Sequence, residues 1–195
     1  FIPLLNPDGY EIYEKDFLAI RNPINRQMLR MQEIPCKEFV GNSRGIDLRK
    51  NFPTQYYRRK QIHSQPASEN ETKALVKVFQ ENSGRGLLSF GYSERRIVYF
   101  RQSQSFAANQ KSYRLARHLQ RQAGLNADKM KYHLDDVEPT GRRGYGSPEQ
   151  FYAEICRQPS FRIEIPYSNG EYVAVPDQAE YKEIHTLPLE YLFSL

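Results

Sequence analysis

Residues 68–100, SENETKALVKVFQENSGRGLLSFGYSERRIVYF, carry the clearest secondary-structure signals in the chain. Ser68 and Glu71 have the spacing of a capping box. The apolar residues that follow recur at helical spacing: Ala74, Leu75, Val78 and Phe79. These features predict a helix over residues 69–82 that ends before Gly84, and the apolar runs at 87–90 and 97–100 predict two strands, or a strand and its return.

The alternation of helices and strands continues after residue 100. Leu115, Ala116 and Leu119 form the stripe of a second helix over 108–123. Pro148 is typical of the first turn of a third helix, which ends before Pro159. The whole pattern favours a layered α/β fold.

The last third of the chain contains a strand signal with a period of two. Phe161, Ile163 and Ile165 alternate with Arg162 and Glu164, which puts the charged pair on the face opposite the apolar residues. A further strand is predicted over 172–175 and a final helix over 178–194. The segments 6–66 and 126–147 are rich in turn formers, so we expect long loops there.

Length and composition indicate one globular domain. The chain has 195 residues, 39% hydrophobic and 13% aromatic. No apolar run approaches the roughly 20 residues of a membrane helix, so we expect no membrane span. The missing initiator Met suggests that Phe1 continues an earlier segment, and no targeting signal identifies a compartment. Cys36 and Cys156 have no CxxC spacing, which disfavours thiolate metal binding and leaves one disulfide open.

The net charge of +5 raises the question of a nucleic-acid partner. Basic residues cluster at 58–60, 95–96 and 142–143, but these clusters are scattered among 23 acidic residues. No RNP-like, zinc-finger or helix-turn-helix pattern accompanies them. The sequence therefore disfavours nucleic acid, and a basic pocket for a carboxylate-bearing ligand fits the same charges.

Five short motifs occur in order along the chain. They are Asn6-Pro7-Asp8-Gly9-Tyr10, GIDLRKNFP at 45–53, SENET at 68–72, Gly146-Ser147 before an aromatic helix, and SFRIE at 160–164. Their order resembles that of the zinc carboxypeptidase family, including bacterial members that cleave γ-D-glutamyl-diaminopimelate bonds in cell-wall peptides. Within that family they are similar to an Asn-Pro-Asp-Gly turn at a strand end, a Gly-Val-Asp-Leu-Asn-Arg-Asn-Phe-Pro segment, a helix-opening Ser-Glu-Pro-Glu-Thr, a glycine-rich loop and a Thr-Ile-Glu strand.

The resemblance implies that residues 1–195 are the C-terminal portion of a carboxypeptidase-like peptidase domain. Its fold would be an α/β/α sandwich with a mixed central sheet, whose early strands are missing from this chain. The complete domain would hold one zinc through His-x-x-Glu and a later His, to polarise the scissile carbonyl and activate water. Because the family's His-x-x-Glu precedes its Asn-Pro-Asp-Gly turn, we expect this chain alone to bind zinc weakly or not at all.

The later zinc ligand has no histidine at its expected place. One alignment with the family puts Tyr92 there, and another puts Phe90 there. A tyrosine must lose a proton with a pKa of about 10 to bind zinc, so we interpret Tyr92 as a structural aromatic, with weak ligation as the alternative. His133-Leu134-Asp135-Asp136 has a metal-motif spacing but falls in a predicted loop, which disfavours it as a metal site.

The resemblance also implies roles for five residues. Glu164 stands at the position of the general base, and its alternative is a solvated strand residue. Arg49 and Lys50 stand where the family has Asn and Arg in contact with a terminal carboxylate, and Lys50 keeps the charge without the bidentate fork. Arg30 matches an oxyanion-stabilising arginine in one register and is a surface arginine in another. Tyr145, in the glycine-rich loop, matches a tyrosine that closes on substrate.

Two functions follow from this pattern. On the resemblance, the complete protein would be a zinc exopeptidase or cell-wall stem-peptide hydrolase, or it would be a catalytically degenerate member that binds peptide or peptidoglycan fragments through a free carboxylate. The presence of Glu164 favours the first function, and the loss of the ligand His and of the Asn-Arg pair favours the second. For the chain as given we expect no activity. The family fold further predicts that Glu164 and Tyr92 lie on neighbouring strands and face one cleft.

Overall fold

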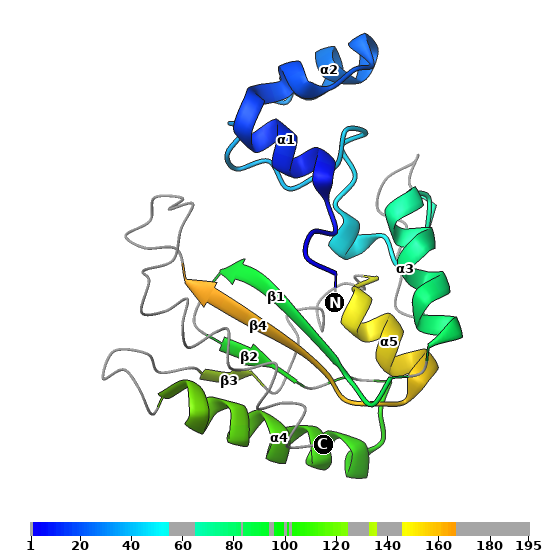
Figure 1. Cartoon of the computed structure of the whole chain (residues 1–195), viewed down its shortest axis with the longest axis vertical. Helices are drawn as coiled ribbons and strands as arrows, with labels where there is room; N and C mark the ends of the chain where they lie inside the picture. The colour runs from blue at the N-terminus through cyan, green and yellow to red at the C-terminus, as the bar shows by residue number, and fades with distance from the viewer. Residues whose placement is uncertain are drawn as a thin grey trace. The chain divides into compact units, whose positions relative to one another are not determined.

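The structure is a computed structural model of the 195-residue chain (Figure 1). It describes residues 2–54, 65–82, 84–93, 96–99, 101, 103–124, 133–135 and 146–166. The chain forms two compact units, Phe1–Val78 with Tyr145–Pro148, and Phe79–Gly144 with Glu149–Leu195. Among the described residues, no helix is long and apolar enough to cross a membrane.

The first unit begins with short helices where the sequence predicts loops. These are α1 (Pro7–Lys15), the 3-10 helix η1 (Asp16–Ala19), α2 (Pro23–Arg30) and the 3-10 helix η2 (Leu48–Lys50). Asn6 caps α1 by accepting a hydrogen bond from the Gly9 N–H at 3.0 Å. Asn22 caps α2 in the same way, and each cap is followed by a proline in the first turn. The prediction of a loop over 6–66 is therefore wrong here, because Asn-Pro is a helix start as well as a turn signal.

A small apolar core holds α1, η1 and α2 together. Its buried members are Ile12, Phe17, Ile20 and Leu29, against which Cys36 and Phe39 pack. The rings of Phe17 and Phe39 meet edge to face, with centroids 5.3 Å apart. Side-chain packing, in addition to the helix caps, thus fixes the positions of α1, η1 and α2.

Gly146 joins the first unit through a backbone contact. It forms an isolated parallel bridge with Asn51, and the Phe52 N–H donates to the Gly146 carbonyl at 2.8 Å. A Cβ at position 146 would overlap the Phe52 carbonyl oxygen and lie 2.8 Å from its carbon. Only glycine allows this approach of the two chain segments.

The second unit is built on a mixed four-stranded sheet. Its strands are β1 (Leu87–Ser93), β2 (Arg96–Val98), β3 (His133–Asp135) and β4 (Ser160–Pro166), in the order β1-β4-β2-β3. β4 is parallel to β1 and antiparallel to β2, and β2 is parallel to β3. β1 and β2 are both predicted, but they are not a strand and its direct return, because β4 lies between them.

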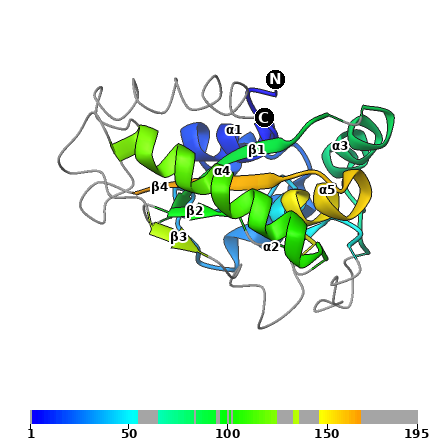
Figure 2. The same ribbon diagram turned by 90° about the horizontal axis from the view of Figure 1, so that it is seen from below.

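Three helices complete the described chain. They are α3 (Asn70–Glu81), α4 (Phe106–Gly124) and α5 (Pro148–Cys156), and all three confirm the predicted helices. Both views show α4 running along the sheet (Figures 1 and 2). The buried Leu115, Ala116 and Leu119 form its apolar stripe, as predicted.

β4 has the alternation that the sequence predicts. Phe161 and Ile163 are fully buried on one face, and Arg162 and Glu164 lie on the other. The α/β class with a mixed sheet is therefore confirmed. β3 corrects the prediction of a continuous loop over 126–147, and the predicted strand at 172–175 and helix at 178–194 lie outside the described residues.

Candidate functional site

Glu164 lies at the centre of a row of residues across three strands. In the sheet register, Gly91 of β1 pairs with Glu164 of β4 on one side. Arg96 of β2 pairs with Glu164 on the other side. Because directly paired positions share a face of the sheet, the row places Gly91, Glu164 and Arg96 side by side.

Both carboxylate oxygens of Glu164 are engaged by arginines. Arg96 Nε donates a short hydrogen bond to Oε2. Arg162, two positions before Glu164 on the same strand face, has its Nε 2.9 Å from Oε1, in an ion pair that lacks the direction of a hydrogen bond. The Glu164 side chain is only 6% exposed, against 15% for Arg162 and 20% for Arg96. The alternative of a solvated glutamate is therefore wrong, and the carboxylate is held inside a cluster of charges.

Gly91 provides space for one of these arginines. A Cβ at position 91 would lie 2.6 Å from Arg162 Nη2 and 3.1 Å from both Cζ and Nε. The guanidinium group therefore covers the position where any side chain at residue 91 would begin. A side chain at residue 91 would require the Arg162 guanidinium to shift from the position that it occupies beside Glu164.

Tyr92 is one position out of register with Glu164. The two residues do lie on neighbouring strands, as predicted, but Tyr92 pairs with Ile165. Consecutive positions of a strand alternate between the two faces of a sheet. The register therefore places Gly91, and not Tyr92, in the row of Glu164, against the expectation that positions 92 and 164 lie on the same face of the sheet.

A second polar group on the same face connects the sheet to α5. The Ser89 hydroxyl donates a short hydrogen bond to Glu149 Oε1, and the Ser160 hydroxyl donates to the Glu149 carbonyl at 2.9 Å. The fully buried Arg101 donates from Nε to Ser160 Oγ at 3.0 Å. These contacts hold the first turn of α5 against β1 and β4, the strands that carry Gly91 and Glu164.

The residues expected to bind a terminal carboxylate contact an internal carboxylate. Arg49 Nη2 and Lys50 Nζ lie 3.0 Å and 3.2 Å from Asp47 Oδ2. Arg49 also donates from Nε to Asp47 Oδ1 at 3.0 Å. Burial raises the pKa of Asp47, but its contacts with Arg49 and Lys50 outweigh burial and bring the pKa below its ordinary value. Arg30, the proposed oxyanion residue, is half-exposed and lies 4.0 Å from Asp16.

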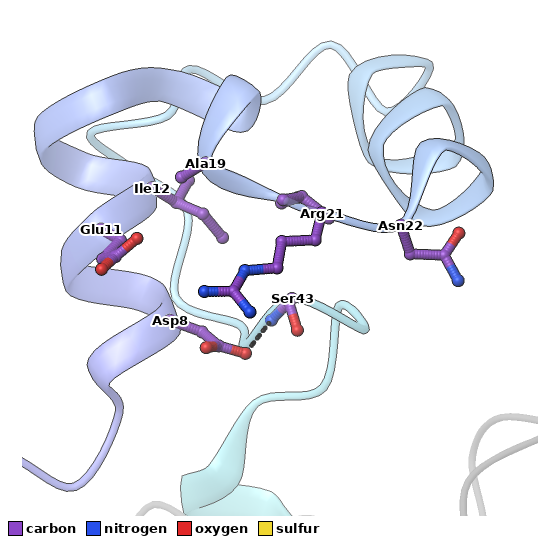
Figure 3. Close-up of a pocket in the computed structure, with 8 residues that line it drawn as sticks. Asp8, Glu11, Ile12, Ala19, Arg21, Asn22 and Ser43 are labelled. Carbon is purple, nitrogen blue, oxygen red and sulfur yellow. Dashed lines mark hydrogen bonds between the residues drawn. The ribbon is translucent and has the colours of Figure 1, made fainter.

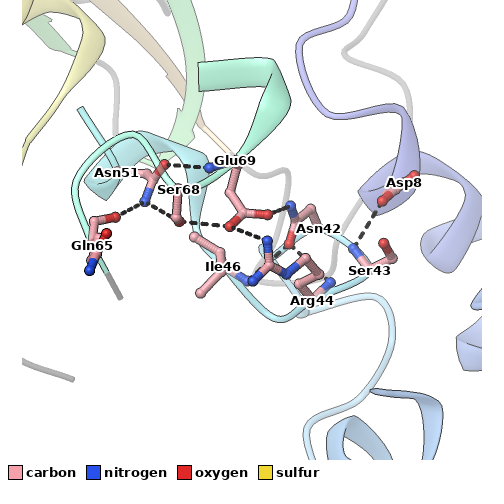
Figure 4. A network of polar contacts seen from close by, with 9 residues as sticks. All are labelled: Asp8, Asn42, Ser43, Arg44, Ile46, Asn51, Gln65, Ser68 and Glu69. Atoms are coloured by element: carbon pink, nitrogen blue, oxygen red, sulfur yellow. Dashed lines mark hydrogen bonds and ion pairs between the residues drawn. The ribbon is translucent and has the colours of Figure 1, made fainter. Parts of the chain in front are cut away.

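A buried polar network organises the loops around η2 (Figure 4). Glu69 accepts hydrogen bonds from Asn42 Nδ2 and from the Ser68 hydroxyl, each at 2.7 Å. Asn51 Nδ2 donates to Ser68 Oγ at 3.0 Å. Asn42 Oδ1 in turn accepts from the Ile46 N–H at 3.1 Å. The network ties the GIDLRKNFP segment to the start of α3.

A cavity of about 360 Å³ lies among α1, the start of α2 and Ser43 (Figure 3). Asp8 and Glu11 contribute carboxylates from α1, and Arg21 extends towards Asp8 and Ser43. Asp8 Oδ2 accepts a hydrogen bond from the Ser43 N–H at 3.1 Å. The cavity is polar and of mixed charge, and no residue predicted for the site lines it.

Two further titratable groups lie close together in the second unit. Burial, followed by the neighbouring Cys156 thiol, raises the pKa of Tyr152 to about 12. The neutral Tyr152 hydroxyl donates to the Gly84 carbonyl at 2.8 Å. Cys36 and Cys156 are both free thiols, and burial raises the pKa of Cys156 despite its hydrogen bond with Tyr152.

The sequence-predicted residues are thus only partly brought together. The described residues contain no group of three His, Cys, Asp or Glu side chains that could hold a metal ion. His133 begins the short strand β3, and Tyr145 lies outside the described residues. Sequence reasoning missed the roles of Gly91, Arg96 and Arg162, although the period of two already put Arg162 and Glu164 on one face.

Comparison with known proteins identifies relatives over most of the chain. A family model described as zinc carboxypeptidase matches residues 1–183. Carboxypeptidase A from Helicoverpa armigera is similar in structure, with a TM-score of 0.69 and 13% identity, and the match covers 99% of this chain and 50% of that one. Bovine thrombin-activatable fibrinolysis inhibitor, solved in complex with tick carboxypeptidase inhibitor, is also similar, with a TM-score of 0.65 and 16% sequence identity. This match covers 98% of this chain and 66% of that one. A comparison with curated proteins finds no significant match.

Proposed function

Because the chain belongs to the zinc carboxypeptidase family, we propose that it forms part of a domain that binds peptides through a free terminal carboxylate without hydrolysing them. The family binds peptide substrates with a free C-terminus. The chain spans 50% of the length of one similar structure and 66% of another. The proposed function is therefore that of the complete protein, of which this chain is a part.

The observation that carries this proposal is the environment of Glu164. A general base must accept a proton from water and pass it on, which requires a carboxylate oxygen directed at that water. Here Arg96 contacts one oxygen of Glu164 and Arg162 contacts the other. Contacts of this kind fix the orientation of the carboxylate and occupy both of its oxygens. Glu164 is therefore better suited to a structural ion pair than to proton transfer.

The donor set around Glu164 also does not fit zinc. Gly91, the partner of Glu164 on β1, has no side chain that could coordinate a metal. Zinc sites in proteins use Cys, His, Asp or Glu ligands, and the residues nearest Glu164 in the row are a glycine and an arginine. We therefore assign no step of the function to a metal bound by this chain.

Recognition of the ligand carboxylate would fall to cations near η2. Arg49 and Lys50 are 42% and 50% exposed at their side chains, so a peptide carboxylate can reach them. The peptide carboxylate would have to compete with Asp47, because Arg49 and Lys50 already contact the Asp47 carboxylate. We therefore expect a preference of only a few-fold for a free carboxylate over an amide, below the roughly tenfold of an uncontested charge-assisted contact. A peptidoglycan stem peptide with a free carboxylate would be one ligand of this kind.

The second candidate is peptide hydrolysis by the complete protein. It is favoured by Glu164 at the position of the family's base, in the SFRIE strand. It requires Arg96 and Arg162 to release the carboxylate when substrate binds. Binding without hydrolysis needs no such rearrangement, which is why we prefer it.

The two candidates are separated by measuring binding and hydrolysis on one preparation of the full-length protein. A peptide with a free C-terminus and its amidated twin are titrated by calorimetry, and cleavage is followed by mass spectrometry with added zinc. We expect weaker binding of the amide and no cleavage, with the preference reduced in Lys50→Ala. Zinc-dependent cleavage that is lost in Glu164→Gln would establish the enzyme, and equal affinity for the two peptides would remove the binding proposal.

A further inference from the structure

The geometry points to a coupled replacement: Arg162 supplies a permanent cation beside Glu164, in space left free by Gly91, where a metal and a ligand at position 91 would otherwise lie. In this view Gly91 and Arg162 depend on each other, and together they make the Glu164 site independent of metal. The inference rests on the proposed function only in treating the Glu164 face as the site. Its test measures zinc affinity and folding stability, whereas the test of the proposed function measures peptide binding and cleavage. The inference and the proposed function can therefore fail separately.

A side chain at residue 91 and the Arg162 guanidinium would need the same space. A Cβ at residue 91 would come within 2.6 Å of Arg162 Nη2 and 3.1 Å of Cζ. A histidine ring at this position would need the volume that the guanidinium fills, and it would displace Arg162 from Glu164. A side chain at residue 91 therefore requires the Arg162 guanidinium to leave its present position.

Two arginines give the surroundings of Glu164 a positive charge. An arginine side chain stays protonated in proteins, so Arg162 cannot lose its charge to make way for a cation. A divalent metal beside Glu164 would be repelled by Arg162 and Arg96, and both already contact the carboxylate. Because the cluster is mostly buried, water screens this repulsion only weakly.

The sheet register decides which positions of β1 lie beside Glu164. Gly91 and Arg96 flank Glu164 directly, and Ser89 pairs with Arg162 in the next row. Phe90 belongs to the opposite face, pairs with Ile163 and is 43% exposed. A histidine at position 90 therefore has the same chemistry as one at 91, on the same strand, but cannot reach Glu164. This makes Phe90→His a matched control.

Zinc chloride titrated into the chelator-treated, full-length protein tests the metal part. We expect wild type and Gly91→His to show no zinc binding that depends on Glu164, and Gly91→His/Arg162→Ala to bind at least about tenfold more tightly than Gly91→His. Phe90→His/Arg162→Ala should show no such gain. Equal zinc affinity of the Gly91→His single and double variants, tight or absent, would overturn the inference, as would stoichiometric zinc in wild type that weakens in Glu164→Gln.

A double-mutant cycle tests the coupling even if the histidine variants do not fold. Gly91→Ala should destabilise the wild type, because the new Cβ displaces the Arg162 guanidinium. In the Arg162→Ala background the same change should be neutral or stabilising, since alanine is a better strand residue than glycine. We expect the two effects on the unfolding equilibrium constant to differ by about tenfold in urea unfolding. Additive effects would show that Gly91 and Arg162 are independent, and would overturn the inference.

Discussion

Removal of the Glu69 carboxylate should destabilise the first unit more than any surface change in the same network. Glu69 is 2% exposed and accepts hydrogen bonds from Asn42 Nδ2 and the Ser68 hydroxyl, each at 2.7 Å. Arg44 lies 3.3 Å from Oε1, but its side chain is 61% exposed. The three contacts therefore differ in how well water can replace them.

The magnitude for Glu69→Ala follows from these contacts. Asn42 is buried and would lose the acceptor of its amide donor, at a cost of about 1–3 kcal/mol. The Ser68 hydroxyl is only partly buried and would lose a bond worth about 0.5–1.5 kcal/mol. The exposed pair with Arg44 adds about 0–1 kcal/mol. We expect a total loss of about 2–4 kcal/mol for Glu69→Ala, and about half of this for Glu69→Gln, which keeps one acceptor oxygen.

The measurement is urea unfolding of the full-length protein followed by far-UV circular dichroism, with Arg44→Ala as the control. Arg44→Ala should cost less than about 1 kcal/mol. Amide hydrogen exchange supplies a local readout, because the Ile46 N–H donates to Asn42 Oδ1 at 3.1 Å and should exchange faster in Glu69→Ala. The reasoning is refuted if Glu69→Ala unfolds within about 0.5 kcal/mol of wild type, or if Arg44→Ala costs as much.

Two further predictions concern the loops that carry the expected substrate contacts. Since Arg49 and Lys50 lower the pKa of folded Asp47, its contribution to stability should be present above the unfolded pKa of about 4 and disappear as pH falls through the folded value. The cost of Asp47→Asn in urea unfolding should therefore be larger at pH 7 than at pH 3, and a pH-independent cost would contradict this account. Gly146→Ala should lower the free energy of unfolding by about 1–3 kcal/mol or more, because the new Cβ overlaps the Phe52 backbone. Gly84→Ala is the control, since a Cβ at residue 84 would lie 3.2 Å from the Tyr152 hydroxyl, which can shift. Thermal unfolding that gives the same midpoint for Gly146→Ala and Gly84→Ala would contradict the assigned contact.

The helices and strands of the second unit could largely be predicted from the sequence. The apolar stripe of α4, the proline at the start of α5 and the alternation of Phe161, Arg162, Ile163 and Glu164 are all local patterns. Each depends on residues a few positions apart, whose spacing matches the period of a helix or a strand. The same alternation already placed Arg162 beside Glu164 on one strand face.

Local patterns misled where one signal has two meanings. Asn6-Pro7 reads as a turn, but the Asn6 side chain caps α1 and the proline occupies its first turn. The choice between turn and helix depends on the residues that follow, Ile12 above all, which is buried in the core with Phe17 and Leu29. Packing thus decided a conformation that dihedral preference alone left open.

By itself, the sequence determined the family, the α/β class and the glutamate at position 164. Only the tertiary structure decided what surrounds that glutamate. Strand pairing brings Arg96 and Gly91 beside Glu164. Arg96 is 68 residues away from Glu164 in the sequence. Register is set by the pairing of whole strands, and a shift of one position exchanges every side chain between the two faces. The register therefore puts Gly91, and not Tyr92, opposite Glu164, and leaves the space that Arg162 fills.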